Sequence, residues 1–248
     1  MELKKKYKII HLKEISSTNF HAYDLLSDKL INSPTLIIAD YQFQGKGQSG
    51  NTWESNAGMN VLLSLIQFPK SIKAVEQFYI SKITAIAVKE TIKVLIKETV
   101  IKWPNDILAG KEKISGILIE NILEGDRINS SVAGVGINVN QVSFNQYPLK
   151  AASIKMITGK DVPLSGIIDS FIERFDNWFE IMEYRDFVHI DKEYLMNLYG
   201  FEKVLSFRKE GVIFEGRIID VEKDGRLVLL LSNNRKQKFV NKEIEFLI

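Results

Sequence analysis

The sequence predicts a mixed α/β (α+β) fold in which helices flank one sheet and a small antiparallel β-barrel follows. Two observations lead to this prediction. Short β-branched runs alternate with stretches of helical spacing through most of the 248 residues, whereas the last segment contains only short strand-like runs separated by turn signals. We therefore expect two domains, a larger one over residues 1–198 and a smaller one over residues 199–248.

Five short runs rich in β-branched residues predict the strands of the sheet. Each is bounded by Gly, Pro, Asn or Asp, which favour turns. The runs are residues 36–40, 60–66, 99–103, 114–121 and 131–140.

Three stretches have apolar residues at helical spacing and predict helices on the sheet. They cover residues 17–30, 74–97 and 163–187. The first begins with Ser17 and Thr18, residue types that cap helices.

The segment after Leu198 alternates short strand runs with turn signals at residues 209–211, 223–225 and 232–234. This pattern predicts a small antiparallel barrel. Because some fifty residues bury little apolar surface, we expect the barrel to pack on the larger domain.

The composition excludes several classes of protein. Apolar residues make up 45% and charged residues 26%, and the apolar runs are far shorter than the roughly 20 residues of a membrane span. The N-terminus shows no signal peptide, so we expect a cytoplasmic protein without a membrane partner. The absence of cysteine excludes disulfides, thiolate nucleophiles and Cys-ligated metals. A net charge of only +2 argues against a dedicated nucleic-acid binder.

Residues 44–50 match the GxGxxG pattern of dinucleotide-binding loops. A Rossmann site needs a helix at these glycines and an acidic residue about 20 positions later, but Lys70 and Ser71 occupy that region. A P-loop is excluded because Asn51 stands where Lys is required. Two interpretations remain: a flexible loop that carries Lys46 and binds phosphate or carboxylate through its backbone amides, or a surface loop.

Residues 102–106 read Lys-Trp-Pro-Asn-Asp and end a predicted strand at a rigid corner. Polar groups at such a corner commonly face a ligand. Asp106 could hold a magnesium ion through water, or bind phosphates through that ion. Asn105 could face the ligand or fix the turn itself as an Asx turn. The alternative is a purely structural turn.

Lys113 stands directly before the strand run that contains Gly116. An ammonium at this entrance can neutralise a phosphoryl or acyl-phosphate transition state. The alternative is a hairpin with solvent-exposed Lys111 and Lys113.

Residues 134–140 carry two glycines and an amide that suit a flat ligand. Gly134 and Gly136 allow close approach to the backbone, and Asn138 can hydrogen-bond adenine or ribose. A tightly packed strand is the alternative for this segment alone.

Five segments, taken in order, carry a resemblance to a known family. They are residues 16–19 (SSTN), 39–55 (ADYQFQGKGQSGNTWES), 102–107 (KWPNDI), 113–120 (KISGILIE) and 134–140 (GVGINVN). With the small C-terminal barrel, their order and spacing resemble the biotin–protein ligase family over essentially the whole chain. The resemblance implies a class II aminoacyl-tRNA synthetase-like catalytic domain over residues 1–198 and an SH3-like β-barrel over residues 199–248.

The same resemblance implies an ATP-dependent biotin–[acetyl-CoA-carboxylase] ligase. Biotin and ATP, with Mg²⁺, would give biotinyl-5′-AMP and pyrophosphate. A lysine of a biotin carboxyl carrier domain would then attack the mixed anhydride. Biotin and that carrier domain are the expected partners, and the chain would act as a monomer or a homodimer.

The resemblance also implies which residues bind each substrate. The biotin-binding residues would be Ser17, Thr18, Asn19, Gln42, Gly45, Lys46, Gly47, Trp53, Lys113, Gly116, Gly134 and Gly136. The ATP-binding residues would be Gln48, Ser49, Gly50, Asn51, Trp53, Lys102, Asn105, Asp106 and Asn138, and Asp106 would be the metal ligand. Lys113 and Lys46 would be catalytic, since joining two anions requires cations from the protein.

The sequence departs from the family in two places. Family loops commonly read GRGRxGRxW, whereas residues 45–53 carry Lys46 as the sole cation, which weakens the expected hold on the adenylate. Bifunctional members have an N-terminal winged-helix domain, but here the first motif begins by Ser16. We therefore expect a monofunctional enzyme that binds no nucleic acid.

Two alternatives remain at this point. A non-catalytic, biotin-responsive regulator would keep the pocket, although Lys102, Asp106 and Lys113 argue against it. A lipoyl or octanoyl transferase would share the fold, and members that transfer directly from a carrier need no ATP. Biotin-dependent pyrophosphate exchange separates the ligase from both.

Overall fold

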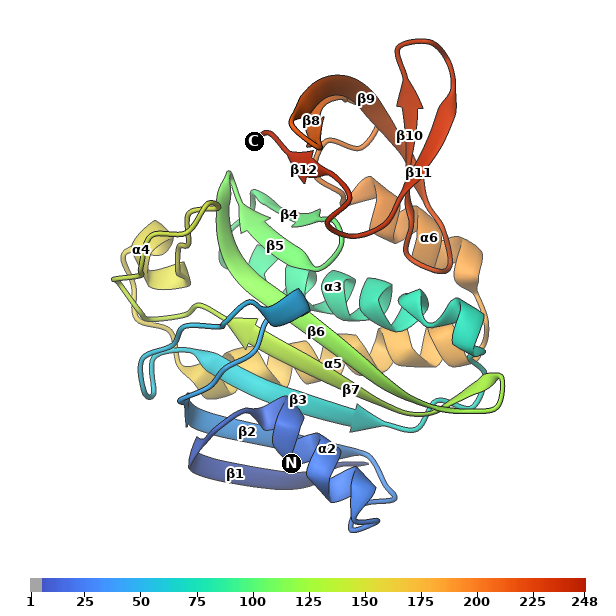
Figure 1. The fold of residues 1–248 in the computed structure, drawn as a ribbon. Coiled ribbons are helices and arrows are strands. Elements are labelled where there is room, and N and C mark those ends of the chain that lie inside the picture. The colour runs from blue at the N-terminus through green and yellow to red at the C-terminus, as the bar shows by residue number, and fades with distance from the viewer. Residues whose placement is uncertain (1–5) are drawn as a thin grey trace.

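The computed structural model describes residues 6–248, with the exception of the Ser49 side chain. Its larger part is built on a seven-stranded sheet with the strand order β1-β2-β3-β7-β6-β5-β4 (Figure 1). The strands are β1 (Lys8–Ile15), β2 (Thr35–Gln42), β3 (Val61–Gln67), β4 (Thr99–Lys102), β5 (Asp106–Ala109), β6 (Glu112–Glu124) and β7 (Arg127–Ile137). Strands β1 and β2 are parallel, and the other neighbours are antiparallel.

All five predicted strands are confirmed, but the sequence pattern missed two others. Strand β1 is an edge strand with several exposed residues, so its charged and apolar residues do not form a clear run. Strand β5 begins at Asp106 itself, and the predicted corner is a tight turn that joins β4 to β5. The prediction for 131–140 ran too far, because β7 ends at Ile137.

Helices cover both faces of the sheet. Helices α3 (Phe78–Lys93) and α5 (Leu164–Glu183) lie against one face, and the short α2 (Thr18–Ser27) lies against the other (Figure 1). Strand β3 is buried along its whole length because it faces both layers. The side chains buried under α2 form a separate small core of Ala22, Ile31, Ile37, Ile66 and Val132.

The three predicted helices are confirmed, with shorter bounds. A 3-10 turn, η2 (Ala74–Glu76), precedes α3, and the shorter helices α4 (Ile154–Thr158) and α6 (Phe187–Met196) were not predicted. The predicted stretch 163–187 is divided because Arg185 adopts a left-handed φ of 61°, and Asp186 caps α6 by accepting a hydrogen bond from the His189 amide.

The C-terminal segment forms a five-stranded antiparallel sheet in the order β11-β10-β9-β8-β12. Its strands are β8 (Val204–Lys209), β9 (Val212–Val221), β10 (Leu227–Leu231), β11 (Lys236–Phe239) and β12 (Glu245–Phe246). All three predicted turns lie between consecutive strands of this sheet. It packs above β4, β5 and α6 (Figure 1).

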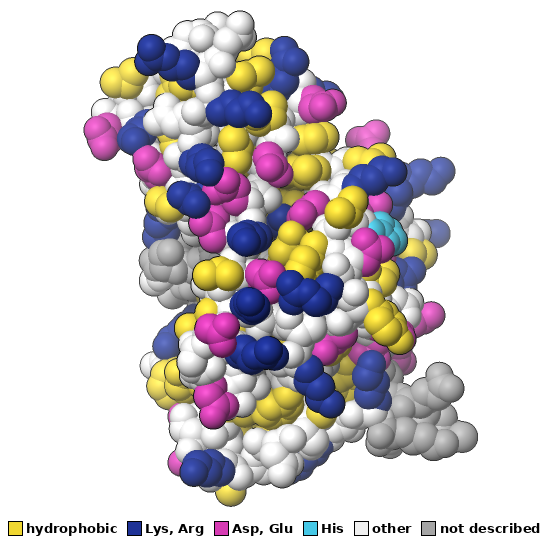
Figure 2. Space-filling view, turned by 90° about the vertical axis from the view of Figure 1, so that its right-hand side faces the viewer, with side chains coloured by type: hydrophobic (Ala, Val, Ile, Leu, Met, Phe, Trp, Pro, Cys, Tyr) yellow, Lys and Arg dark blue, Asp and Glu magenta, His cyan; other side chains and the backbone are white. Residues whose placement is uncertain are grey.

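Charged side chains of both signs are interspersed on the molecular side that Figure 2 presents. This distribution agrees with the net charge of +2. Of the helices in residues 6–248, none combines the length and apolar composition that a membrane crossing requires.

A buried lysine connects the helices to the C-terminal sheet. The Lys82 side chain on α3 is fully buried, and its Nζ atom lies 2.6 Å from Asp191 Oδ1 on α6 and 2.8 Å from the Val221 carbonyl on β9. The ammonium also lies 4.9 Å from the centre of the Tyr79 ring. Burial lowers the pKa of Lys82, and Asp191 opposes this effect. The ion pair thus contacts three elements at once.

We predict that Asp191→Asn destabilises the protein. The substitution leaves the Lys82 ammonium buried without this counterion. Because the Asp191 side chain is 35% exposed, we expect a loss at the low end of the range for breaking a buried ion pair, about 3 kcal/mol. Urea unfolding measures the loss. Asp186→Asn is the matched control on the same helix, since asparagine also caps helices and the exposed pair with His189 contributes little. Equal unfolding free energies for the two variants would contradict the prediction.

Candidate active site

A cavity of about 1150 Å³ lies between the glycine loop, the sheet and the C-terminal sheet. Sixteen of the predicted site residues line it, although they come from segments far apart in the chain. They are Ser17, Thr18, Asn19, Gln42, Lys46, Gly47, Gln48, Asn51, Trp53, Lys102, Asn105, Asp106, Lys113, Gly116, Gly134 and Gly136. The structure therefore brings the five segments to one place.

Two predicted glycines do not line the cavity. Gly45 is buried beneath Trp53: its carbonyl accepts from the Trp53 amide at 2.8 Å, and a Cβ at this position would lie 2.6 Å from the Trp53 carbonyl oxygen. Gly50 is exposed and has a φ of 85°, so it serves the turn. The Ser49 side chain lies outside the described part of the chain.

Asn138 is not among the residues that line the cavity, and its contact with a nucleotide stays a prediction. The side chain is buried, and its Nδ2 atom donates to the Ala152 carbonyl at 3.0 Å. Ala152 in turn donates its amide to the Lys113 carbonyl at 2.9 Å. Asn138 therefore supports the backbone that holds Lys113. Its Oδ1 atom is buried without a hydrogen-bond partner.

A polar network closes one end of the cavity at the start of α2. Gln42 Oε1 accepts from the Thr18 amide at 2.6 Å and from the Thr18 hydroxyl at 3.0 Å. The Ser64 hydroxyl lies 2.7 Å from Thr18 Oγ1 and 2.5 Å from Asn19 Oδ1. Ser17 occupies the N-cap position of α2, but its side chain makes no capping hydrogen bond. This end of the cavity offers hydroxyl and amide groups to a polar ligand.

The network includes two residues that the sequence analysis missed. Glu120 Oε2 accepts from Asn19 Nδ2 at 2.8 Å, and Ser64 is a buried hydroxyl within an otherwise apolar strand run. Ser64 could have been identified, since a single polar residue in such a run needs a hydrogen-bond partner. Glu120 carries no comparable signal in the sequence.

The Trp53 indole lies flat against glycine backbone on the floor of the cavity. Gly116 on β6 pairs with Gly136 on β7. A Cβ atom at Gly116 would lie 2.8 Å from the Trp53 ring, and one at Gly136 would lie 2.4 Å from it. Any other residue at these positions would therefore displace the indole. The buried Trp53 Nε1 atom has no hydrogen-bond partner, so it is a donor that a ligand can use.

Gly134 is required for a different contact. A Cβ atom here would lie 2.1 Å from Asn19 Oδ1. The two strand glycines of the GxG motif thus make room for two different side chains, Asn19 and Trp53.

Two lysines and one carboxylate form the charged centre of the cavity. Lys113 Nζ lies 2.6 Å from Asp106 Oδ1, and Lys102 Nζ lies 3.9 Å from Asp106 Oδ2. Burial lowers the pKa of Lys102, an effect that Asp106 opposes and Lys113 reinforces. Two cations therefore face a single anion, and an anionic ligand would be attracted to this centre.

The sheet register explains how these charges meet. Lys102 on β4 pairs directly with Asp106 on β5, and Asp106 pairs with Gly116 on β6, so all three face the same side. A register shift between Ile107 and Leu108 then pairs Leu108 with Lys113. This β-bulge turns Lys113 to the same face as Asp106, which is a recognised use of bulges beside active sites.

Asn105 holds the tight turn between β4 and β5. Its Nδ2 atom donates to the Ile117 carbonyl at 2.5 Å, and its own carbonyl accepts from the Ile117 amide at 3.1 Å. This contact to β6 is not the Asx turn considered above, and because Asn105 also lines the cavity, its contact with a ligand stays a prediction.

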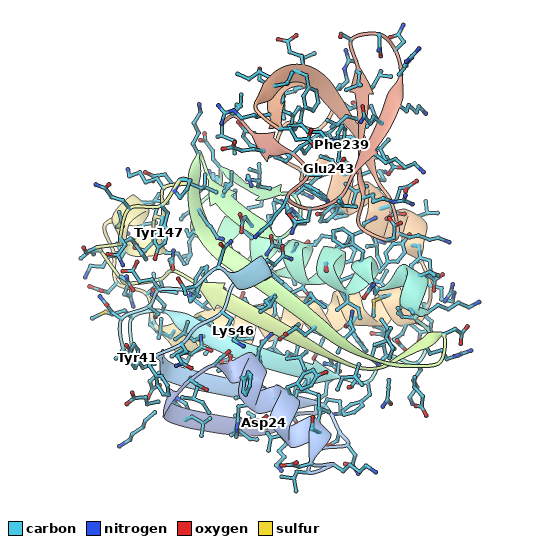
Figure 3. All side chains as sticks on the ribbon, in the orientation of Figure 1. Asp24, Tyr41, Lys46, Tyr147, Phe239 and Glu243 are labelled. Carbon is cyan, nitrogen blue, oxygen red and sulfur yellow. The ribbon has the colours of Figure 1, made fainter. Side chains whose placement is uncertain are left out.

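Lys46 lines the cavity but lies apart from the charged centre. Its Nζ atom is 4.5 Å from the centre of the exposed Phe20 ring on α2. Figure 3 shows Lys46 in front of the sheet near α2. In the same view Tyr147 lies in the loop before α4, and Glu243 lies in the C-terminal segment.

Further cations line the cavity from segments that the sequence analysis did not connect with it. They are Lys111, Lys150, Arg208 and Lys242. With the three predicted lysines they outnumber the lining carboxylates, which are Asp106, Glu210, Glu243 and Glu245. Arg208 and Lys242 come from the C-terminal sheet, which the local motifs do not include.

The glycine loop also contacts the C-terminal sheet directly. Gln48 Oε1 accepts from Asn241 Nδ2 at 2.8 Å. Gln48 therefore connects the loop to the segment before β12 and closes one side of the cavity.

The arrangement suits a ligand that has an anionic group at one end and a flat apolar part that ends in polar groups at the other. Within residues 6–248, no group of three or more His, Cys, Asp or Glu is placed to hold a metal ion. Asp106 alone fits Mg²⁺ that arrives with a nucleotide, because Mg²⁺ keeps several waters and commonly uses one or two carboxylates beside phosphate oxygens.

Comparisons with known proteins point to one family. The sequence model of the Biotin/lipoate A/B protein ligase family matches residues 12–138. Bifunctional ligase/repressor BirA of Bacillus subtilis is 31% identical over 244 residues, which cover 96% of this chain and 73% of the relative. Biotin--[acetyl-CoA-carboxylase] ligase of Paracoccus denitrificans is 24% identical over 225 residues, which cover 88% of this chain and 92% of the relative.

Solved structures agree with the architecture. Biotin protein ligase from Aquifex aeolicus in complex with biotin and ATP has a TM-score of 0.78 and 22% identity, and the match covers 96% of this chain and 98% of that one. The expected fold, a class II aminoacyl-tRNA synthetase-like α/β unit followed by a small SH3-like sheet, is thereby confirmed.

We predict that Gly136→Ala displaces Trp53 from the cavity floor. The new methyl group would overlap the indole, and such overpacking costs about 1–3 kcal/mol. Tryptophan emission should shift, since Trp53 is one of only three tryptophans. Gly166→Ala is the control, because no heavy atom lies within 4 Å of a Cβ there. An unchanged emission spectrum in Gly136→Ala would show that the indole does not depend on this glycine.

Proposed function

The chain belongs to the Biotin/lipoate A/B protein ligase family, and from this premise we propose that it is a biotin–protein ligase. In the first step biotin and ATP give biotinyl-5′-AMP and pyrophosphate. In the second step a lysine of a biotin carboxyl carrier domain takes the biotinyl group and AMP leaves. The name of the Paracoccus denitrificans relative, Biotin--[acetyl-CoA-carboxylase] ligase, supports this substrate.

One observation carries the proposal: the Lys102–Asp106–Lys113 centre lies beside the Trp53 floor in a single cavity. The first step joins a carboxylate to a phosphate, and both are anions. Ammonium groups that already face the cavity lower the cost of bringing these anions together and stabilise the charge that develops. The protein needs no nucleophile, because positioning and charge supply the catalysis.

The proposed first step uses Lys113 as the principal cation. A carboxylate oxygen of biotin attacks the α-phosphorus of ATP, the acyl–phosphate bond forms, and the bond to pyrophosphate breaks. Lys113 would contact the carboxylate and the α-phosphate, and Lys102 would contact the phosphates. Bound Mg²⁺ would neutralise phosphate charge, with Asp106 as its protein ligand.

The other end of the cavity suits the biotin head group. Ser17, Thr18 and Gln42 present hydroxyl and amide groups to a ureido ring, and the Trp53 indole presents an apolar face. The Ser17 side chain is well suited, since it makes no capping hydrogen bond within α2.

The family description also includes lipoate ligases, so a lipoyl or octanoyl transferase is the second candidate. Pyrophosphate exchange distinguishes the two. A biotin ligase exchanges pyrophosphate into ATP only with biotin, whereas a lipoate ligase does so with lipoate.

We expect the purified protein to catalyse ATP–pyrophosphate exchange that requires biotin and to modify one lysine of a carrier domain. Exchange is measured with labelled pyrophosphate, beside reactions with octanoate and lipoate, and the carrier is analysed by mass spectrometry. Exchange with lipoate alone would support the second candidate. Absence of both exchange and carrier modification, with an active control ligase, would reject the proposal.

We further predict that Lys113→Met lowers the exchange rate by about 10²–10³-fold, the usual effect of removing one charge-stabilising group. Methionine keeps the aliphatic stem that lies beside Gly116 and Trp53. The dissociation constant of biotin should change far less, because the charge matters most as the phosphate reacts. Lys160→Ala, an exposed lysine outside the cavity, is the control. Equal losses in exchange and in biotin binding would place Lys113 outside the reaction centre.

A further inference from the structure

The C-terminal end of the chain forms part of the cavity wall. Residues 241–248 all line the cavity. Strand β12 is held in place by pairing with β8, in which Phe246 faces Phe207, and by a 3.1 Å hydrogen bond from the Leu247 amide to the Ser206 carbonyl. This wall is therefore a fixed part of the C-terminal sheet.

Phe246 lies against the charged centre. The centre of its ring is 5.1 Å from Lys102 Nζ and 6.5 Å from the centre of the Trp103 ring. On its other side the ring makes an edge contact with Phe207, at 5.0 Å between ring centres. Phe246 thus connects the aromatic core of the C-terminal sheet to a lysine of β4.

The contact of Lys102 with the carboxylate of Asp106 is long. Asp106 Oδ2 lies 3.9 Å from Lys102 Nζ, which is too long for a hydrogen bond, and Asp106 Oδ1 is already bonded to Lys113. The Lys102 side chain is only 19% exposed, and a cation–π contact is strongest where water is excluded.

We propose that Phe246 is a positioning residue for the adenylation step, because its ring holds the Lys102 ammonium where the nucleotide phosphates bind. This inference rests on the proposed ligase function. It assigns part of the nucleotide site to the C-terminal sheet, far from the KWPND motif in sequence.

The test compares three variants of the full-length chain. Phe246→Leu removes the ring but keeps an apolar side chain, and Phe246→Tyr keeps the ring. Phe214→Leu is the matched control, because Phe214 is also partly buried and also contacts the Phe207 ring, in a stacked arrangement at 5.7 Å, but does not line the cavity. Pyrophosphate exchange gives the KM for ATP and kcat. Calorimetry gives the affinities for a non-hydrolysable ATP analogue and for biotin. The free energy of unfolding is measured for each variant.

We expect Phe246→Leu to lower both the affinity for the ATP analogue and the kcat/KM for ATP by about three- to thirtyfold. This range corresponds to the loss of a cation–π contact at an exposed site and at a dehydrated site, respectively. Biotin affinity should stay within about twofold, and Phe246→Tyr should restore nucleotide binding. Phe214→Leu should lower the free energy of unfolding by a similar amount but leave the affinity for the ATP analogue and the kcat/KM for ATP unchanged.

Three results would overturn the proposal: equal nucleotide affinity in Phe246→Leu and the wild type, the same loss in Phe214→Leu, or no recovery in a folded Phe246→Tyr. If the wild type shows no biotin-dependent exchange, the ligase function is rejected instead, and analogue affinity still decides whether Phe246 supports a nucleotide site.

Discussion

A single lateral row of residues across the sheet sets the geometry of the whole cavity. Lys102, Asp106, Gly116 and Gly136 occupy directly paired positions on β4, β5, β6 and β7, so they share one face. The charged pair therefore lies beside bare backbone, and Trp53 covers that backbone. A slip of one residue between any two of these strands would turn the charges toward the core under α3.

Lys113 reaches the same face only because the ladder is irregular. Ile114, the next residue, lies in the buried core, whereas the shift in pairing turns Lys113 toward Asp106. The Lys113 amide donates to the Lys150 carbonyl at 2.8 Å, and the Lys113 carbonyl accepts from the Ala152 amide at 2.9 Å. These two hydrogen bonds hold this backbone from outside the sheet. The catalytic geometry thus requires both the regular row and the one bulge that interrupts it.

The sequence predicted what local patterns encode. Five strands, three helices and the turns of the C-terminal sheet follow from short patterns, whereas most of the sixteen cavity residues follow from the resemblance to a known family. It missed β1 and β5, whose short or half-exposed runs lack a clear period, and it missed Arg208, whose contribution depends on how two distant sheets pack. Asn138 was assigned to the nucleotide because an amide beside glycines suits a ligand, and the structure adds that its side chain donates to the Ala152 carbonyl, a contact that the sequence pattern does not reveal.

The β4–β5 hairpin joins the site to the C-terminal sheet. Trp103 lies within its turn and donates from Nε1 to the Gly225 carbonyl at 2.9 Å, while the buried Lys82 pair fixes β9 against α3 and α6. These contacts place Arg208 and Lys242 at the cavity, beside the hairpin that carries Lys102 and Asp106. Residues 45–53 contain one cation, Lys46, where the loops of the family commonly carry arginines. The positive charge near the ligand therefore comes largely from other segments. The same sheet also brings Glu210, Glu243 and Glu245 to the cavity, and Arg208 pairs with Glu245 at 2.8 Å. The docked C-terminal sheet therefore covers the site, whereas the excess of positive charge comes from lysines of the larger part, namely Lys46, Lys102, Lys111, Lys113 and Lys150.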